Sequence, residues 1–379
     1  MIRSLRSIAL VVMLAACARN APASETPPTS APVEIARPVS PDIDAWINAS
    51  TLPVINAGFA DAERYTRLPL RYRPRVSPPV WILSRRSAGL AIRFSSDATK
   101  LHARWRTGSI AMPHMTDNAV RGLDLYTLTP DGARYLGTGR TSEGGSHDAV
   151  LVSGLAPKTR EFILYLPLYE SLESIELGVN ADASIKPPQS QWFEGPPLVV
   201  YGTSIAQGAC ASRPGMAWPA ILSRRLRREV INLGFSGNGK LDTPLAAVLA
   251  EIDAGAYILD CLPNLDPEGV AERTGPFVES LLGARPDTPV ILVENPRYPG
   301  ATDRPDLARL IESKNAALRE ALGRLRAAHP DAMIELVTTD RPAPEPDDLT
   351  ADGIHPTDAG MRAHADRLES TLREVLDRD

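Results

Sequence analysis

The stretch LVVYGTSIAQG, residues 198–208, decides the fold class of the C-terminal half of the chain. Its first four residues are apolar and predict a short buried strand, and the glycine and threonine that follow make the chain turn before an apolar helical segment begins. Ser204 therefore stands at the carboxyl end of a strand, where ligands collect in an open α/β sheet. A serine in such a turn is common in soluble proteins, so its meaning depends on the rest of the sequence.

Strands and helices alternate from this stretch to the C-terminus. Apolar runs predict strands at residues 198–201, 230–233, 256–260, 290–294 and 333–337. Amphipathic segments predict helices at residues 216–228, 244–252, 269–282 and 305–329, and Thr357 is a good N-cap for a last helix that runs to residue 376. This alternation predicts a parallel sheet covered by helices on both faces, a flavodoxin-like three-layer α/β/α domain over residues 191–379.

Residues 42–190 have a different pattern. Apolar and polar residues alternate at 90–94, 101–105, 123–128, 149–152, 161–166 and 175–179, and turn sequences such as PDG at 130–132 and EGG at 143–145 separate these runs. Short strands at this spacing predict an antiparallel, jelly-roll-like β-sandwich. The length of 379 residues fits two such domains.

The first 17 residues have the composition of an export signal. Two arginines precede a short apolar core that ends in Leu-Ala-Ala-Cys at Cys17. This ending resembles a bacterial lipoprotein signal, which implies cleavage before Cys17 and lipid on its thiol; a plain signal peptide is the alternative. Ala18 resembles the outer-membrane default, so we expect an exported lipoprotein of the cell envelope that faces the periplasm, held to a membrane by its acyl chains alone. Residues 18–41, rich in Pro, Ala, Ser and Thr, predict an extended tether.

The composition narrows the classes of partner. A net charge of −5 without basic runs argues against nucleic acid as a partner, and no internal stretch is long enough to span a bilayer. No Cys/His cluster has metal-ligand spacing and no glycine loop resembles a phosphate cradle, so we expect neither a metal nor a cofactor. The pattern does not indicate an oligomeric state.

Two cysteines remain once Cys17 is assigned to lipid. Export would place Cys210 and Cys261 in an oxidising compartment, where an even pair favours a disulfide, and both are predicted near the same sheet edge. Two buried, reduced thiols are the alternative, and the sequence leaves both open.

The segment DGIHP, residues 352–356, supplies what a nucleophilic serine needs. A serine hydroxyl requires a base to remove its proton, and His355 is the best candidate in the domain. Asp352 lies three residues earlier, so one turn can bring its carboxylate to the imidazole and fix the tautomer. Taken alone the segment reads as a turn and a helix lead-in, but a strand-end serine in the same domain favours the catalytic interpretation.

Two further segments follow predicted strands and could hold a developing oxyanion. The stretch NLGFSGNG at 232–239 offers free backbone N–H groups in a glycine-rich turn, and CLPN at 261–264 places the amide of Asn264 beyond the third strand. Each is an ordinary turn or cap when considered singly. Their position at consecutive strand ends beside Ser204 makes them candidates.

These residues carry a resemblance. Ser204, Gly237, Asn264 and His355 match, in order and spacing, the four blocks of the SGNH/GDSL hydrolase superfamily. The motif GLDLY at 122–126 resembles the Gly-x-Asp-Leu-Tyr signature of the N-terminal β-domain in its two-domain esterase branch, and the resemblance covers residues 42–376. It implies that Ser204 is the nucleophile, His355 the base and Asp352 its orienting partner. It also implies an oxyanion hole made of the Ser204 and Gly237 backbone N–H groups and the Asn264 side chain.

Two blocks depart from the superfamily pattern. Thr203 replaces the aspartate that usually precedes the serine, and LPNL at 262–265 lacks the glycine and aspartate of the usual Gly-x-Asn-Asp block. Both variants suit the narrower branch, but they make substrate inference from the whole superfamily unsafe. Arg213 is a candidate for binding a polar or anionic part of the substrate, with a helix-start surface residue as the alternative. His114, in a loop between two β-domain strands, could overhang the site but is otherwise an ordinary loop histidine.

The resulting expectation is a cofactor-independent serine esterase. It would remove small acyl groups, acetyl first among them, from a carbohydrate through an acyl-serine intermediate; the carbohydrate rests on analogy with exported esterases. Acyl transfer to an alcohol acceptor by the same triad is the enzymatic alternative. A non-catalytic glycan binder is the alternative of a different class, and the intact set of catalytic residues argues against it.

Overall fold

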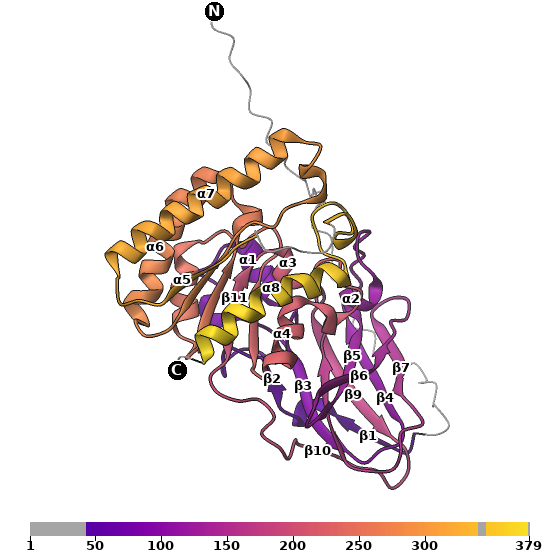
Figure 1. Ribbon diagram of the computed structural model, residues 1–379. Helices are drawn as coiled ribbons and strands as arrows, with labels where there is room; N and C mark the ends of the chain where they lie inside the picture. The colour runs from indigo at the N-terminus through magenta and orange to yellow at the C-terminus, as the bar shows by residue number, and fades with distance from the viewer. Residues whose placement is uncertain (1–42, 340–345, 378–379) are drawn as a thin grey trace, which may run out of the picture. The chain divides into compact units, whose positions relative to one another are not determined.

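Two antiparallel sheets form the N-terminal region in the computed structural model, which describes residues 43–339 and 346–377 (Figure 1). One sheet has the order β1 (Ala45–Asn48), β9 (Leu172–Val179), β4 (Leu101–Thr107), β7 (Ser146–Val152). The other has the order β10 (Ile185–Lys186), β3 (Ala91–Ser96), β8 (Arg160–Tyr165), β5 (Leu123–Thr129), β6 (Gly132–Gly139), with β2 (Val54–Ile55) paired to β3. The short helices α1 (Pro78–Ser84) and α2 (Asp117–Arg121) connect strands of this region.

Strand β5 shows how the period of two builds this region. Leu123 and Leu125 point into the core between the two sheets, where they pack with Trp105 and other apolar side chains. Asp124 and Tyr126 point to the opposite face, and Tyr126 belongs to a cluster that includes Ala220 of the α/β region. One face of β5 thus holds the sandwich together, and the other meets the second half of the chain.

Five parallel strands form the sheet of the C-terminal region. Their order is β12 (Val230–Gly234), β11 (Leu198–Gly202), β13 (Ala256–Asp260), β14 (Val290–Val293), β15 (Ile334–Val337). Numbered along the chain from β11, this is the flavodoxin-like order 2-1-3-4-5, whose switch point lies beside the first strand. The predicted fold class is confirmed, and each observed strand lies within one residue of its predicted bounds.

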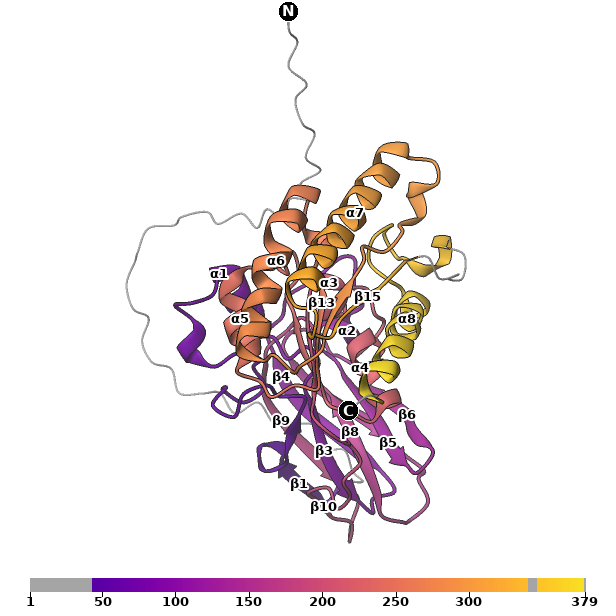
Figure 2. The ribbon, with the colours of Figure 1, turned by 60° about the vertical axis from the view of Figure 1, so that its left-hand side comes forward.

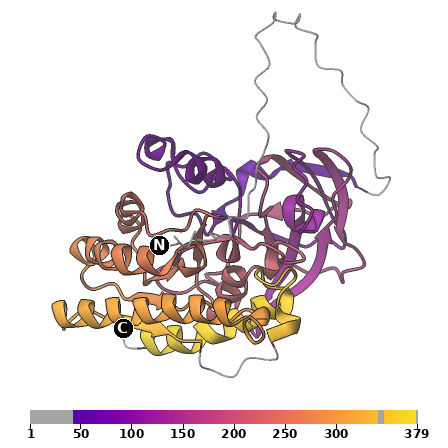
Figure 3. The ribbon, with the colours of Figure 1, turned by 90° about the horizontal axis from the view of Figure 1, so that it is seen from above.

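Helices cover both faces of this sheet (Figure 2). Helices α5 (Thr243–Ala250), α6 (Pro267–Ala284) and α7 (Pro305–Ala328) bury their apolar stripes on one face. Helices α3 (Ser204–Gln207), α4 (Trp218–Leu226) and α8 (Asp358–Leu376) pack on the other. The two long helices α6 and α7 lie side by side, as Figures 1 and 3 show.

The β region and the α/β region belong to one compact unit. The predicted boundary at residue 190 falls between the last strand of the first region, β10, and the first strand of the second, β11. The predicted signal sequence, the lipid site at Cys17 and the tether lie outside the described residues. Within residues 43–339 and 346–377, no helix is long and apolar enough to cross a membrane.

Candidate active site

Ser204 is the first residue of α3, directly after the turn that ends β11. Thr203 caps this helix: its hydroxyl accepts a hydrogen bond from the Ile205 N–H at 3.2 Å. Because the first N–H groups of a helix have no carbonyl partner within it, the Ser204 N–H is available to a ligand. The residue is 9% exposed, so its hydroxyl stands at the edge of the core.

Three side chains form a hydrogen-bonded relay. Ser204 Oγ lies 2.9 Å from His355 Nε2, and His355 Nδ1 lies 2.7 Å from Asp352 Oδ2. The imidazole is therefore placed to take a proton from the serine on one nitrogen while the carboxylate holds the other. The sequence predicted this triad from residues about 150 positions apart, and the fold brings them into contact.

The loop that carries Asp352 and His355 is held at both ends. A β-bridge and two backbone hydrogen bonds close residues 349–357, and Gly353 takes a left-handed conformation (φ +86°) at the tip. Asp352 Oδ1 accepts the backbone N–H groups of Ile354 (3.0 Å) and His355 (2.8 Å). Partial burial works against the charge, but the hydrogen bonds from His355 and Ile354 outweigh it and hold the pKa of Asp352 below its usual value.

The predicted oxyanion segments pack directly against the serine turn. A Cβ on Gly239 would lie 2.1 Å from the Gly202 carbonyl oxygen, so only glycine permits this approach. The amide oxygen of Asn264 accepts the N–H groups of Asn238 (3.1 Å) and Gly239 (3.2 Å), which leaves its NH₂ group as the free donor end. The loop with the exposed Gly237 is thus tied to Ser204 on one side and to Asn264 on the other.

Gln207 is a supporting residue that sequence reasoning missed. It is fully buried; its amide oxygen accepts the Ser236 N–H (2.9 Å), and its NH₂ donates to the Leu168 carbonyl (3.2 Å). The side chain therefore joins the serine helix to the Gly237 loop and to the β region. Its place in the GTSIAQG stretch was visible, but nothing in the spacing indicated its partners.

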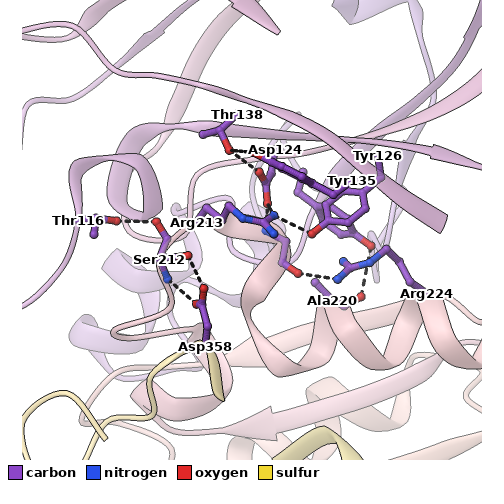
Figure 4. A network of polar contacts seen from close by, with 12 residues as sticks. Thr116, Asp124, Tyr126, Tyr135, Thr138, Ser212, Arg213, Ala220, Arg224 and Asp358 are labelled. Atoms are coloured by element: carbon purple, nitrogen blue, oxygen red, sulfur yellow. Dashed lines mark hydrogen bonds and ion pairs between the residues drawn. The ribbon is translucent and has the colours of Figure 1, made fainter. Parts of the chain in front are cut away.

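The partners of the Arg213 side chain are residues of the β region (Figure 4). Its guanidinium forms an ion pair with the fully buried Asp124 carboxylate, donates to Tyr126 Oη at 2.7 Å and lies 4.0 Å from the centre of the Tyr135 ring. Asp124 also accepts the backbone N–H of Gly215 at 2.9 Å. These contacts account for the position of Arg213 without a substrate, and its predicted substrate role stays a prediction.

A second chain of contacts joins the β region to the catalytic loop (Figure 4). Thr116 Oγ1 donates to the Ser212 carbonyl at 2.6 Å, and Ser212 donates its N–H (2.9 Å) and hydroxyl (2.6 Å) to the Asp358 carboxylate. Asp358 begins α8, three residues after His355. The β region thus supports the helix that follows His355.

The two cysteines form no disulfide. Cys261 is fully buried in the core on the α5–α7 face of the sheet, where its thiol points to the Tyr201 carbonyl. Cys210 follows α3 on the other side, and its Sγ–H donates to the His114 carbonyl at 3.1 Å. Of the two interpretations left open, the structure shows reduced thiols, each directed at a different backbone carbonyl. Burial, together with the Asp352 charge, raises the pKa of Cys210 to about 11.

His114 does overhang the site. Its ring centre lies 5.8 Å from that of His355 at an interplanar angle of 30°. Cys210, which sequence reasoning considered only for a disulfide, lies beside the same residues: its Sγ, a carboxylate oxygen of Asp352 and a ring nitrogen of His355 lie within 4.8 Å of one another. Sequence spacing gave no signal for this group, because Cys210 lies far along the chain from Asp352 and His355.

Comparisons with known proteins identify the family of the chain. The model of the GDSL-like Lipase/Acylhydrolase family matches residues 196–373, and a model of the N-terminus of SGNH-hydrolase-type esterases with the GxDLY motif matches residues 45–185. Among curated proteins, none matches the chain at a significant level.

Several solved structures of other proteins match this chain along most of its length. A GDSL-like lipase from Bacteroides ovatus is 34% identical, with a TM-score of 0.83 over 88% of this chain and 98% of that one. The salicylyl-acyltransferase SsfX3 from a tetracycline biosynthetic pathway is 18% identical (TM-score 0.67; 88% and 97% covered). The acetyl xylan esterase Est2A from the rumen bacterium Butyrivibrio proteoclasticus is 12% identical (TM-score 0.52; 88% and 99% covered). The last two show likeness of fold alone.

The chain has a serine relay at the switch point of its sheet and a relative that is 34% identical along most of its length. It belongs to the GDSL-like lipase/acylhydrolase family of the SGNH superfamily, with an N-terminal GxDLY esterase domain, and is an ester hydrolase.

Proposed function

We propose that this esterase removes small acyl groups, acetyl first among them, from a carbohydrate, and that it does so through an acyl-serine intermediate. The observation that carries the catalytic part is the relay itself: Ser204 Oγ at 2.9 Å from His355 Nε2, and His355 Nδ1 at 2.7 Å from Asp352. A serine with a base and an orienting carboxylate in one line is the arrangement that nucleophilic acyl transfer requires.

The first step forms the acyl-enzyme. Ser204 Oγ attacks the ester carbonyl carbon while its proton moves to His355 Nε2, and the negative charge that develops on the carbonyl oxygen is met by three donors. These are the backbone N–H groups of Ser204 and Gly237 and the NH₂ group of Asn264. Asp352 stabilises the imidazolium, the bond between the carbonyl carbon and the alcohol oxygen breaks, and the alcohol leaves with the proton from His355.

The second step releases the acid. A water molecule gives its proton to His355 Nε2 and attacks the acyl carbon, the same donors hold the oxyanion, and Ser204 leaves with the proton returned by the imidazole. The products are a carboxylic acid and the regenerated serine, so no cofactor is needed to balance the reaction.

The substrate part of the proposal has different support. Folds similar to this one occur in proteins described as an acetyl xylan esterase and as a family two carbohydrate esterase from Cellvibrio japonicus. The loop that carries His114 lies beside His355, with ring centres 5.8 Å apart, and the His114 carbonyl accepts the Cys210 thiol; groups this close to the triad favour a short acyl chain. The Leu-Ala-Ala-Cys ending at Cys17 supports export to the envelope, where polysaccharides occur.

Acetate release tests the proposal. The full chain and a Ser204→Ala variant are incubated with an aryl acetate, with aryl esters of longer acids and with acetylated xylo-oligosaccharides. We expect Ser204-dependent release that is fastest for acetate and extends to the sugar esters. Equal release by the variant would remove the catalytic assignment, and a preference for long acyl chains would remove the acetyl assignment. New esters formed with added alcohols, at the expense of free acetate, would identify an acyltransferase instead.

Envelope attachment needs its own test. In a Gram-negative bacterial host, the full chain is expected in the membrane fraction, and a Cys17→Ala variant is expected to be released from it because it cannot carry lipid. An unchanged distribution of the variant would contradict lipidation at Cys17.

A further inference from the structure

A potential metal-binding group combines two residues of the triad with a neighbouring thiol. The thiol of Cys210, a carboxylate oxygen of Asp352 and a ring nitrogen of His355 lie within 4.8 Å of one another. Cys210 and His355 are partly buried and Asp352 is exposed, so the group is reachable from solvent on one side. Sulfur, imidazole nitrogen and carboxylate oxygen are the three donor types that Zn²⁺ combines in proteins.

The backbone sets this thiol in place. Cys210 has a left-handed conformation (φ +64°), which is uncommon for a residue other than glycine. It follows the short helix that Ser204 begins, and its Sγ–H is held by the His114 carbonyl at 3.1 Å. The thiol therefore stands at a fixed position next to the loop that carries Asp352 and His355.

We propose that Cys210, Asp352 and His355 bind Zn²⁺ and that this binding switches the esterase off. Bond lengths of about 2.3 Å to sulfur, about 2.0–2.1 Å to nitrogen and about 2.0–2.2 Å to oxygen place three such ligands around one ion, with water in the fourth position. Binding replaces the Cys210 thiol proton by the metal, and that proton passes to solvent.

Inhibition follows from the geometry of the relay. A metal on His355 Nδ1 displaces the hydrogen bond to Asp352, whereas a metal on Nε2 occupies the lone pair that must accept the proton of Ser204. In the first case the neutral ring carries its proton on Nε2, and in the second the Nε2 lone pair is taken by the metal, so in neither case can the imidazole accept the serine proton. The inhibition is reversible, because removal of the ion by a chelator restores the hydrogen bonds.

The test compares the full chain with a Cys210→Ser variant. Serine keeps a donor for the His114 carbonyl but is a poor zinc ligand. Cys210→Gly, which suits the left-handed backbone, is a second variant in case the first is unstable. Each protein is assayed for aryl ester hydrolysis against Zn²⁺ concentration, relative to its own rate without metal. We expect Zn²⁺ to inhibit the unmodified chain, EDTA to restore it, and the variants to need at least about tenfold more Zn²⁺, since even outer-sphere changes cost that much in affinity.

A binding readout separates this proposal from the proposed function. Co²⁺ is titrated into each protein, because a cobalt–thiolate bond gives a charge-transfer absorption whether or not the protein is active. The band is expected in the unmodified chain and absent from the Cys210 variants. Persistence of the band in the variants would assign it to Cys17 or Cys261 and overturn the proposal. So would Zn²⁺ inhibition that is equal in all three proteins, or no inhibition of the unmodified chain.

Discussion

Replacing Asp352 with asparagine changes the charge of the relay and leaves its shape nearly intact. In the present structure Oδ1 accepts two backbone N–H groups, at 3.0 and 2.8 Å, and Oδ2 faces His355 Nδ1 at 2.7 Å. The two backbone donors require an acceptor, so the asparagine oxygen must take the Oδ1 position. Its NH₂ group then faces Nδ1 and makes that nitrogen an acceptor.

The wrong tautomer of His355 is the consequence. If Nδ1 accepts, the ring proton of neutral imidazole sits on Nε2 and points at Ser204 Oγ, so the ring cannot receive the serine proton. The same substitution in a serine protease triad lowers kcat by roughly 10⁴-fold, and a factor of 10⁴ corresponds to about 5 kcal/mol in the barrier. We expect a loss of that order in kcat for Asp352→Asn, with little change in KM.

Steady-state hydrolysis of an aryl acetate measures this loss, with Asp331→Asn at an exposed position after α7 as the matched control. The Asp352→Asn variant should unfold at nearly the wild-type temperature at low pH, because the asparagine oxygen still accepts the two backbone N–H groups. The pKa of Asp352 is lowered in the folded state, so its carboxylate stabilises the wild-type fold at every pH above its unfolded pKa. Wild type loses this advantage over the Asp352→Asn variant as the pH falls through the folded pKa. A variant that keeps kcat within about tenfold of wild type would refute the tautomer argument.

Three further predictions concern the surroundings of the relay. Asn264→Ala should lower kcat by roughly 10²–10³-fold through loss of an oxyanion donor; a change confined to KM in the aryl ester assay would contradict that role. Asp124→Asn should lower the free energy of unfolding by up to about 3 kcal/mol, measured by urea denaturation, because the Arg213 charge loses its buried partner, while burial, which raises the pKa of Asp124, offsets part of this loss; an unchanged midpoint would show that the pair adds nothing. Burial and the nearby Arg121 charge lower the pKa of His147 to about 4 in the folded chain. In the unfolded chain this pKa is about 6.5, so below that pH the unfolded chain binds more protons than the folded one. Wild type should therefore lose stability as the pH falls from about 6.5 to about 4, and His147→Gln should lose less; parallel melting curves would refute this.

Long periodic elements could be predicted from the sequence because their burial pattern is local. Helices α7 and α8 end within a residue of their predicted bounds, and Thr357 caps α8 as expected by accepting the Gly360 N–H. Strand β6 was missed because its sequence, GARYLGTG, has no clean alternation and leaves Tyr135 exposed. Helix α1 was not predicted; it begins at Pro78 and Pro79, and prolines at the first helical positions can start a helix.

The triad could be predicted because its members lie in short motifs of defined order. The contacts that support it could not, since they join segments that no spacing relates. Ser212 links Thr116 of the β region to Asp358 of α8, and Cys210 meets both His114 and the catalytic loop. The disulfide remained open for the same reason: Cys210 follows the short helix α3 and Cys261 follows strand β13, and the sequence does not indicate where each thiol points.

The central claim is that Ser204 carries the acyl group between the two steps. The most direct measurement is to mix the full chain with an aryl acetate, quench it in acid within the first turnover, and analyse its peptides by mass spectrometry. The account predicts an acetyl ester on Ser204, in the peptide that contains GTSIAQG, and no acetylation of this peptide in Ser204→Ala. Acetate release without an acetylated Ser204, or an acetyl group found on Cys210 instead, would contradict it.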